Sequence, residues 1–176
     1  IIPAALLVLG GGGAGPFFML SPKPAAAEGA DGHDAPKDDD AAGIAAAARI
    51  TRDRPSIDMV IYNAGVSQIG PFAETTEASH RRVFEINYFA AVALARAFLA
   101  PIRAARGTHL AISSVAGFAP LHNRTAYAAS KHAMEGFFAS LRSEEADHGV
   151  RTLIAAPSFV ATNIGRPERG EDGIGR

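Results

Sequence analysis

Cysteine is absent from this chain of 176 residues, so neither disulfide bonds nor thiolate-bound metal sites are available. An excess of charge of either sign is missing too: 17 Lys and Arg stand against 18 Asp and Glu, a formal net charge of -1. This balance, with arginines scattered along the chain, argues against nucleic acid as a partner. The six histidines show no spacing typical of a metal site, so we expect no bound metal.

A long unbroken apolar run is also missing from residues 1–30. Pro16, Pro22 and Pro24 interrupt the apolar opening, which is too short and broken for a membrane span. We therefore expect no membrane partner and a cytoplasmic location. The less favoured alternative is a signal peptide with a small-residue cleavage site near residues 24–27, but a basic start is lacking.

What is present is an alternation of strand-like and helix-like segments, which predicts an α/β protein with a parallel sheet. The 48% hydrophobic content is enough for one core. The expected strands lie at 5–9, 31–36, 57–62, 108–113 and 150–156. The expected helices lie at 41–54, 74–104 and 125–147.

Tyr127 and Lys131 are four residues apart and so share one face of the expected helix. A free phenol titrates near pH ~10 and is a poor base at neutral pH. A nearby ammonium favours the phenolate, so this spacing can assemble an acid–base pair. Ser114 lies thirteen residues before the tyrosine, at the end of an expected strand. Ser113 is the competing serine, but alternation along a strand turns it to the other face.

Asn87 falls inside an apolar stripe of helical period in the segment VFEINYFAAVALARAF. A buried amide needs hydrogen-bond partners or an ordered water. Asn87 is therefore a candidate for the same site.

These residues resemble the short-chain dehydrogenases/reductases in their common single-domain form. The matching segments, in the family's order and near its spacings, are YNAG at 62–65, FEIN ending at 87, ISSVAG at 112–117, YAASK at 127–131 and APSFVAT at 156–162. The resemblance implies that Ser114, Tyr127 and Lys131 form a catalytic triad, which Asn87 completes through a water. Tyr127 would be the general acid/base, Lys131 would activate it and bond the nicotinamide ribose, and Ser114 would hold the substrate oxygen.

The resemblance also implies a nicotinamide cofactor, NAD or NADP, with the choice left open. The cofactor-binding candidates, besides Tyr127 and Lys131, are Asn63, Ala64, Gly65, Asp38, Pro157 and Thr162. Asn63 to Gly65 would end a strand at the carboxyl edge of the sheet, where α/β folds bind ligands. Asp38 is either the acidic contact to the adenine or part of the acidic first turn of the next helix. Thr162 would reach the carboxamide.

The family implies a Rossmann-like, doubly wound parallel sheet, and here we expect it to be incomplete. Residues 1–164 would form one domain, with 1–30 a degenerate amino-terminal part, 31–164 the recognisable core and 165–176 a flexible tail. Gly10, Gly12 and Gly15 satisfy GxGxxG, but no frame gives the family's TGxxxGxG turn. The prolines that follow oppose the helix that should receive the pyrophosphate.

The expected function is an NAD(P)-dependent oxidoreductase that interconverts a secondary alcohol and a ketone by hydride transfer. Its partners would be a small alcohol or carbonyl substrate and, as is common in the family, a second copy docked through the long helices. The alternative is a catalytically silent, truncated relative that serves as a binding or dimerisation module.

Overall fold

The computed structural model of the chain describes residues 6–9, 18–20 and 37–159. Its elements follow the order β1 (Leu6–Leu9), β2 (Phe18–Leu20), α1 (Lys37–Asp53), β3 (Met59–Tyr62), η1 (Phe72–Glu74), α2 (Glu77–Phe84), η2 (Glu85–Phe89), α3 (Ala90–Ala105), β4 (Thr108–Ile112), η3 (Val115–Gly117), α4 (Thr125–Glu145), η4 (Ala146–His148) and β5 (Arg151–Ala155). The expected strand at 31–36 lies outside the described residues, as does the tail from residue 160. The proposed domain boundaries therefore stay predictions.

The five strands form one sheet in the order β2-β1-β3-β4-β5. β3, β4 and β5 run parallel, as expected for a Rossmann-like core. β1 instead runs antiparallel to β3, and β2, which the sequence did not predict, pairs antiparallel with β1. The expected parallel arrangement is thus wrong for the first strand. A parallel neighbour needs a crossover connection of a dozen or more residues, so the short link of residues 10–17 accounts for the antiparallel pairing of β1 with β2. The length of this link does not explain the direction of β1 against β3.

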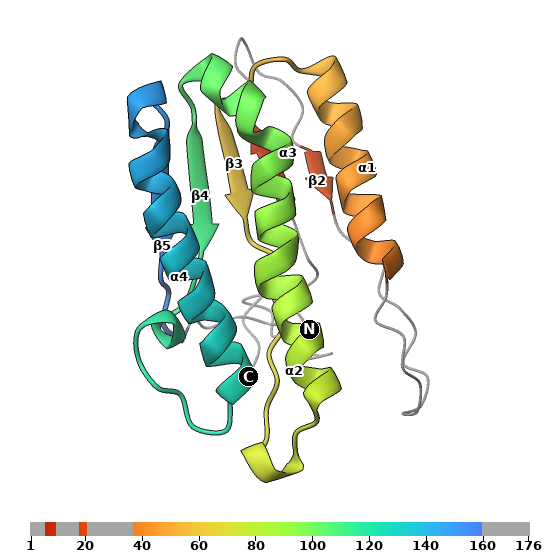
Figure 1. The fold of residues 1–176 in the computed structure, drawn as a ribbon, viewed down its shortest axis with the longest axis vertical. Helices are drawn as coiled ribbons and strands as arrows, with labels where there is room; N and C mark the ends of the chain where they lie inside the picture. The colour runs from red at the N-terminus through yellow and green to blue at the C-terminus, as the bar shows by residue number, and fades with distance from the viewer. Residues whose placement is uncertain (1–5, 10–17, 21–36, 160–176) are drawn as a thin grey trace, which may run out of the picture.

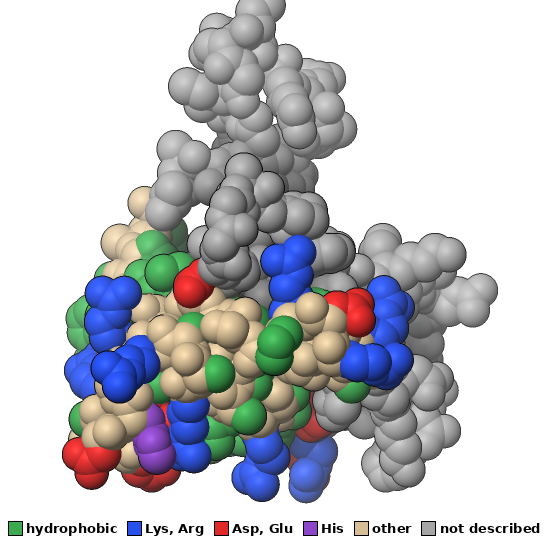
Figure 2. Space-filling view, turned by 90° about the horizontal axis from the view of Figure 1, so that it is seen from above, with side chains coloured by type: hydrophobic (Ala, Val, Ile, Leu, Met, Phe, Trp, Pro, Cys, Tyr) green, Lys and Arg blue, Asp and Glu red, His purple; other side chains and the backbone are tan. Residues whose placement is uncertain are grey.

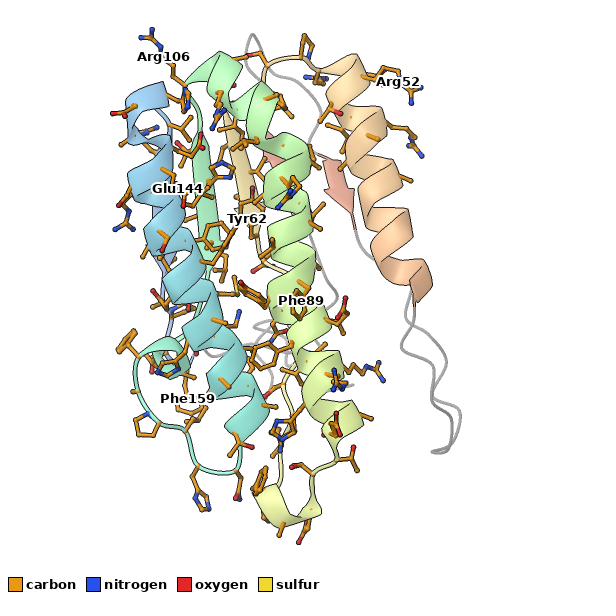
Figure 3. All side chains as sticks on the ribbon, in the orientation of Figure 1. Arg52, Tyr62, Phe89, Arg106, Glu144 and Phe159 are labelled. Carbon is orange, nitrogen blue, oxygen red and sulfur yellow. The ribbon has the colours of Figure 1, made fainter. Side chains whose placement is uncertain are left out.

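Helices α1, α3 and α4 pack side by side on one face of the sheet (Figure 1). Strand residues that point to this face alternate with less buried ones, so Val60 and Tyr62 are buried while Met59 and Ile61 are half-buried. The largest buried apolar side chains between sheet and helices are Phe98, Phe138, Ile57, Ile102 and Met134. Tyr62 lies between the strands and helices α3 and α4 (Figure 3), where it contacts Phe138.

The helix expected at 74–104 is observed as one continuous helical run from Glu77 to Ala105. It consists of α2, the π-helical turn η2 and α3. Thr76 caps its start reciprocally with Ser79. This run is long and apolar enough by length and composition to cross a membrane. Within the fold its apolar stripe packs against the core, with Ala91, Ala95, Phe98 and Ile102 buried.

The end of the molecule seen in Figure 2 shows Lys and Arg side chains spread around its rim and interspersed with Asp and Glu. The described part of this face therefore has no single basic patch. This distribution matches the scattered arginines of the sequence.

One buried ion pair joins the carboxyl-terminal ends of α3 and α4. Arg103 donates from Nε and Nη2 to the two carboxylate oxygens of Glu145, at 2.7 Å each. The Glu145 side chain is 3% exposed and that of Arg103 is 38% exposed. Arg103 holds the pKa of Glu145 below its usual range, mainly through this hydrogen bond, against the opposing effect of burial.

We expect Arg103→Leu to lower the free energy of unfolding at pH 7 by more than the control variant below, because it leaves the buried carboxylate of Glu145 without its partner. The pKa of Glu145 is lowered in the folded state, so the pair stabilises the fold above the unfolded pKa. This stabilisation is lost as the pH falls through the folded pKa. Urea denaturation at pH 7 and in mild acid measures both effects. The matched control is Arg81→Leu, which breaks the exposed Glu77–Arg81 pair and should cost less than about 1 kcal/mol. Equal losses in the two variants would contradict the assignment.

Candidate active site

The carboxyl ends of β3, β4 and β5 meet the amino-terminal half of α4 at one edge of the sheet (Figure 1). Backbone hydrogen bonds continue past the strand ends: Ser113 N–H donates to Ala155 O at 2.7 Å, and Val115 N–H donates to Pro157 O at 3.1 Å. The segments after β4 and β5 are therefore held side by side. Candidate residues from distant parts of the sequence converge at this edge.

Asn87 lies fully buried in the π-helical turn η2 and ties three segments together. Its Oδ1 accepts from Val66 N–H at 2.8 Å, while its Nδ2 donates to Val66 O at 3.0 Å and to Ser130 Oγ at 2.9 Å. Ser130 Oγ in turn donates to Tyr127 O at 2.8 Å. Both amide donors of Asn87 are thus used, so a relay water reaching its side chain would have to donate to Oδ1. The predicted partner requirement of this amide is met.

Lys131 is 3% exposed, and its ammonium group sits against the end of β4. Nζ donates to Ile112 O at 2.9 Å and to Met134 Sδ at 3.6 Å. Since an ammonium has three donors, one remains for a ligand among the described surroundings. Nζ also lies 5.9 Å from the centre of the Tyr127 ring, within reach of a cation–π interaction. Burial lowers the pKa of Lys131 to about 8, while the negative charge of Glu135 opposes this decrease.

Ser114 lies two residues after the end of β4, and Tyr127 lies one helical turn before Lys131 on α4. Ser114 caps the short turn η3, its Oγ accepting from Ala116 N–H at 3.2 Å, and is 8% exposed. Tyr127 lies half-buried in the first turn of α4. The side chain of Ser113 lies near Gly117 instead: a Cβ added to Gly117 would lie 2.8 Å from Ser113 Oγ. The choice of Ser114 over Ser113 and the catalytic roles stay predictions.

Gly65 connects the NAG segment directly to this group of residues. A Cβ added to Gly65 would lie 3.6 Å from Asn87 Oδ1 and 3.7 Å from Lys131 Nζ. Gly65 is buried, and Asn63 and Ala64 are half-buried beside it at the end of β3. The predicted ligand edge thus brings the glycine beside the amide and the ammonium.

The remaining cofactor candidates are less closely placed. Asp38 lies in the first turn of α1, which favours the alternative of an acidic helix start, and its contact with adenine stays a prediction. Pro157 is exposed just after β5, and Thr162 lies outside the described residues. The glycines at 10, 12 and 15 are also outside them. Leu9 pairs with Met59 at the start of β3, so the chain leaves β1 at the edge opposite the candidate site.

These residues fit the nicotinamide–ribose end of a dinucleotide. A buried ammonium with a free donor and a glycine without a side chain offer a hydroxyl-binding cradle at the ligand edge of an α/β sheet. Lys131, Tyr127 and the segment from Asn63 to Gly65 would hold that end. For the pyrophosphate end, the described residues include no glycine turn followed by a helix after β1.

Three structural residues of the site were missed from the sequence. Ser130 links Asn87 to Tyr127, the carbonyl of Ile112 receives Lys131, and the backbone of Val66 receives Asn87. Ser130 had a usable signal, because it lies three residues after Tyr127 and thus on the same helix face. The two backbone partners had none, since any residue type can supply them.

Known proteins with the same pattern were found both by sequence and by structure. The short chain dehydrogenase family matches residues 34–173. Dehydrogenase/reductase SDR family member 7B of Bos taurus is 42% identical over 120 residues, which is 68% of this chain and 37% of that protein. The SDR family protein 7-like of Drosophila melanogaster is 38% identical over 110 residues, which is 61% of this chain and 33% of that protein. The chain therefore spans little more than a third of these relatives.

Solved structures give the same result. A short-chain dehydrogenase from Streptomyces avermitilis superposes with a TM-score of 0.67 at 33% identity, covering 71% of this chain and 46% of the other. A metagenomic short-chain oxidoreductase in complex with NADP gives a TM-score of 0.64 at 33% identity, covering 70% and 57%. The family match spans most of the chain, and the tetrad segments fall inside it. The chain belongs to the short-chain dehydrogenase/reductase family.

Proposed function

We propose that this protein is an NAD(P)-dependent oxidoreductase that interconverts a secondary alcohol and a ketone, with Tyr127 as the general acid/base. The observation that carries the proposal is the buried ammonium of Lys131, which lies by the Tyr127 ring and keeps a donor for a ligand. Membership of an oxidoreductase family and a structural neighbour in complex with NADP support it. The choice between NAD and NADP stays open.

The proposal assigns a role to each residue of the site. Ser114 donates a hydrogen bond to the substrate oxygen and stabilises the negative charge that develops on it. Tyr127 gives its phenolic proton to that oxygen in reduction and takes a proton from the alcohol in oxidation. The nicotinamide supplies or accepts the hydride when bound. Lys131 favours the phenolate of Tyr127 and bonds the ribose, and Asn87 fixes the strand-end segment that contains Gly65.

We also propose a cytoplasmic protein that forms a homo-oligomer through the long helices. What supports the interface is an exposed aromatic side chain, Phe89, at the junction of η2 and α3, which is 51% exposed (Figure 3). Buried aromatic side chains are the usual anchors of protein interfaces.

The alternative proposal, a silent relative that binds or dimerises, rests on the amino-terminal part. β1 pairs antiparallel with both β2 and β3 there. Such a chain would keep the proton-handling residues without a complete nucleotide site.

Isotope transfer tests the leading proposal. The purified chain is incubated with NADPH or NADH carrying deuterium on either face of C4, together with a panel of ketones. We expect one deuterium at the carbinol carbon from one face of the ring alone, as read by mass spectrometry. Nucleotide oxidation without deuterium in the alcohol, or no product with any ketone of the panel, would favour the alternative.

A further inference from the structure

A second polar group lies beneath the site and takes no part in the tetrad. Ser113 Oγ and Glu135 Oε1 are both buried, and neither has a hydrogen-bond partner among the described residues. Both contact the same point: a Cβ added to Gly117 would lie 2.8 Å from Ser113 Oγ and 3.0 Å from Glu135 Oε1. Both oxygens therefore border the space that a side chain at position 117 would fill. A buried carboxylate oxygen without a hydrogen bond is unfavourable, so its position calls for an explanation.

The placement of Glu135 relative to the catalytic elements supplies that reason. Lys131 and Glu135 are one helical turn apart on α4, so they share a face. Lys131 Nζ contacts Ile112 O, and Glu135 Oε1 faces Ser113, the next residue along the chain. The residue after that is Ser114. The ammonium and the carboxylate thus dock on successive residues at the end of β4.

Gly117 makes this placement sterically feasible. A side chain at this position would also lie 2.8 Å from Glu135 Cγ, closer than real Cβ atoms come to their neighbours. Glu135 would then have to swing away from Ser113. The glycine of ISSVAG therefore keeps room for the carboxylate.

We propose that Glu135 is a positioning residue. Its carboxylate, buried near Gly117 and Ser113, favours the charged form of Lys131, which in turn favours the phenolate of Tyr127. This inference rests on the proposed function, since it assigns Lys131 its role there. Burial favours the neutral amine and the charge of Glu135 favours the ammonium, and with both effects present the pKa of Lys131 is lowered to about 8. Glu135 supplies the opposing charge.

Among the described residues, the groups that contact Lys131 do not supply a negative charge in place of Glu135. Asn87, Gly65 and the end of β4 offer neutral groups, and Tyr127 is the other titratable side chain in contact. The acidic residue of the π-helical turn η2 is Glu85, two positions before Asn87.

The protonation of Lys131 can be measured without cofactor or turnover, because the chain contains three lysines: Lys23, Lys37 and Lys131. Lysine labelled with ¹³C at Cε gives an NMR signal whose shift follows protonation, and Lys131→Arg assigns it. In the wild type we expect a midpoint near pH 8. In Glu135→Gln the midpoint should fall by about half a pH unit or more, since an opposite charge is removed. Gly117→Ala, which displaces the carboxylate without removing it, should shift the midpoint in the same direction.

Glu144→Gln is the matched control, because this exposed carboxylate lies toward the far end of α4 (Figure 3). Its Lys131 midpoint should equal that of the wild type. If Glu135→Gln leaves the midpoint unchanged while remaining folded by its amide spectrum, the inference is overturned. If Glu135→Gln does not fold, Gly117→Ala tests the inference in its place. A lower Lys131 midpoint in Gly117→Ala supports the inference, and an unchanged midpoint overturns it. Failure of the proposed function itself appears separately, as absent deuterium transfer by the wild type.

Where the protein is active, the lowered pKa of Lys131 in Glu135→Gln should also change how kcat/KM depends on pH. We expect the alkaline limb of kcat/KM to move to lower pH in Glu135→Gln by the shift seen for Lys131. A purely structural role would lower the whole profile without moving this limb.

Discussion

Tyr127→Phe is expected to lower the rate of carbonyl reduction by about two to four orders of magnitude, the usual contribution of a positioned proton donor. The phenyl ring keeps the packing over Lys131, so only the hydroxyl is removed. Nucleotide affinity should change little, because the bonds of Lys131 to Ile112 and Met134 do not involve Tyr127. Steady-state kinetics and a nucleotide titration, done on one preparation, measure the two effects.

Tyr88→Phe is the control for this substitution. Tyr88 lies half-buried in η2, where its ring contacts Phe89 and Phe137, away from the described bonds of the tetrad. Its kcat/KM should stay within a few-fold of the wild type. Wild-type turnover in Tyr127→Phe would remove Tyr127 from the mechanism, whereas equal losses in the two variants would point to a general effect of tyrosine removal.

Asn87→Ala is expected to lower the free energy of unfolding by about 2–4 kcal/mol, because it leaves several buried polar groups without partners. The groups affected are Val66 N–H, Val66 O and Ser130 Oγ. The loss should also loosen the segment around Gly65, so activity should fall even at temperatures where the variant stays folded. Chemical denaturation followed by circular dichroism gives the stability change.

Asn63→Ala provides the comparison, since the structure shows no side-chain hydrogen bond from Asn63 to the described residues. Its stability should change by less than about 1 kcal/mol. A stability loss in Asn63→Ala as large as in Asn87→Ala would show that the hydrogen bonds of Asn87 are not the cause.

The core of the fold could be predicted from the sequence because its signals are local. β4 and α4 were expected at 108–113 and 125–147, within two residues of their observed bounds, since an apolar strand and a clear helical stripe define them. The sheet order and direction of β1 could not be predicted in this way. Strand direction depends on pairing with residues far along the chain, and LLVL reads equally well in either direction.

The same division holds for the candidate site. The spacing of Tyr127 and Lys131 indicates an acid–base pair, and the family's motifs imply the roles of Ser114 and Asn87. Glu135 has no such signal, because an acidic residue in a helix is ordinarily a solvated one. Only the packing of α4 against η3 shows that one of its oxygens is buried near Gly117 and Ser113.

The central claim is that these residues form the catalytic half of a nucleotide-dependent oxidoreductase, and nucleotide binding tests it most directly. The purified 176-residue chain is titrated with NADPH and with NADH while its thermal unfolding is recorded. We predict micromolar binding of at least one of them, with stabilisation of about 2.7 kcal/mol at 100 times the dissociation constant. No change in the unfolding temperature at millimolar concentrations of either nucleotide would contradict the account and leave the chain as a silent member of its family.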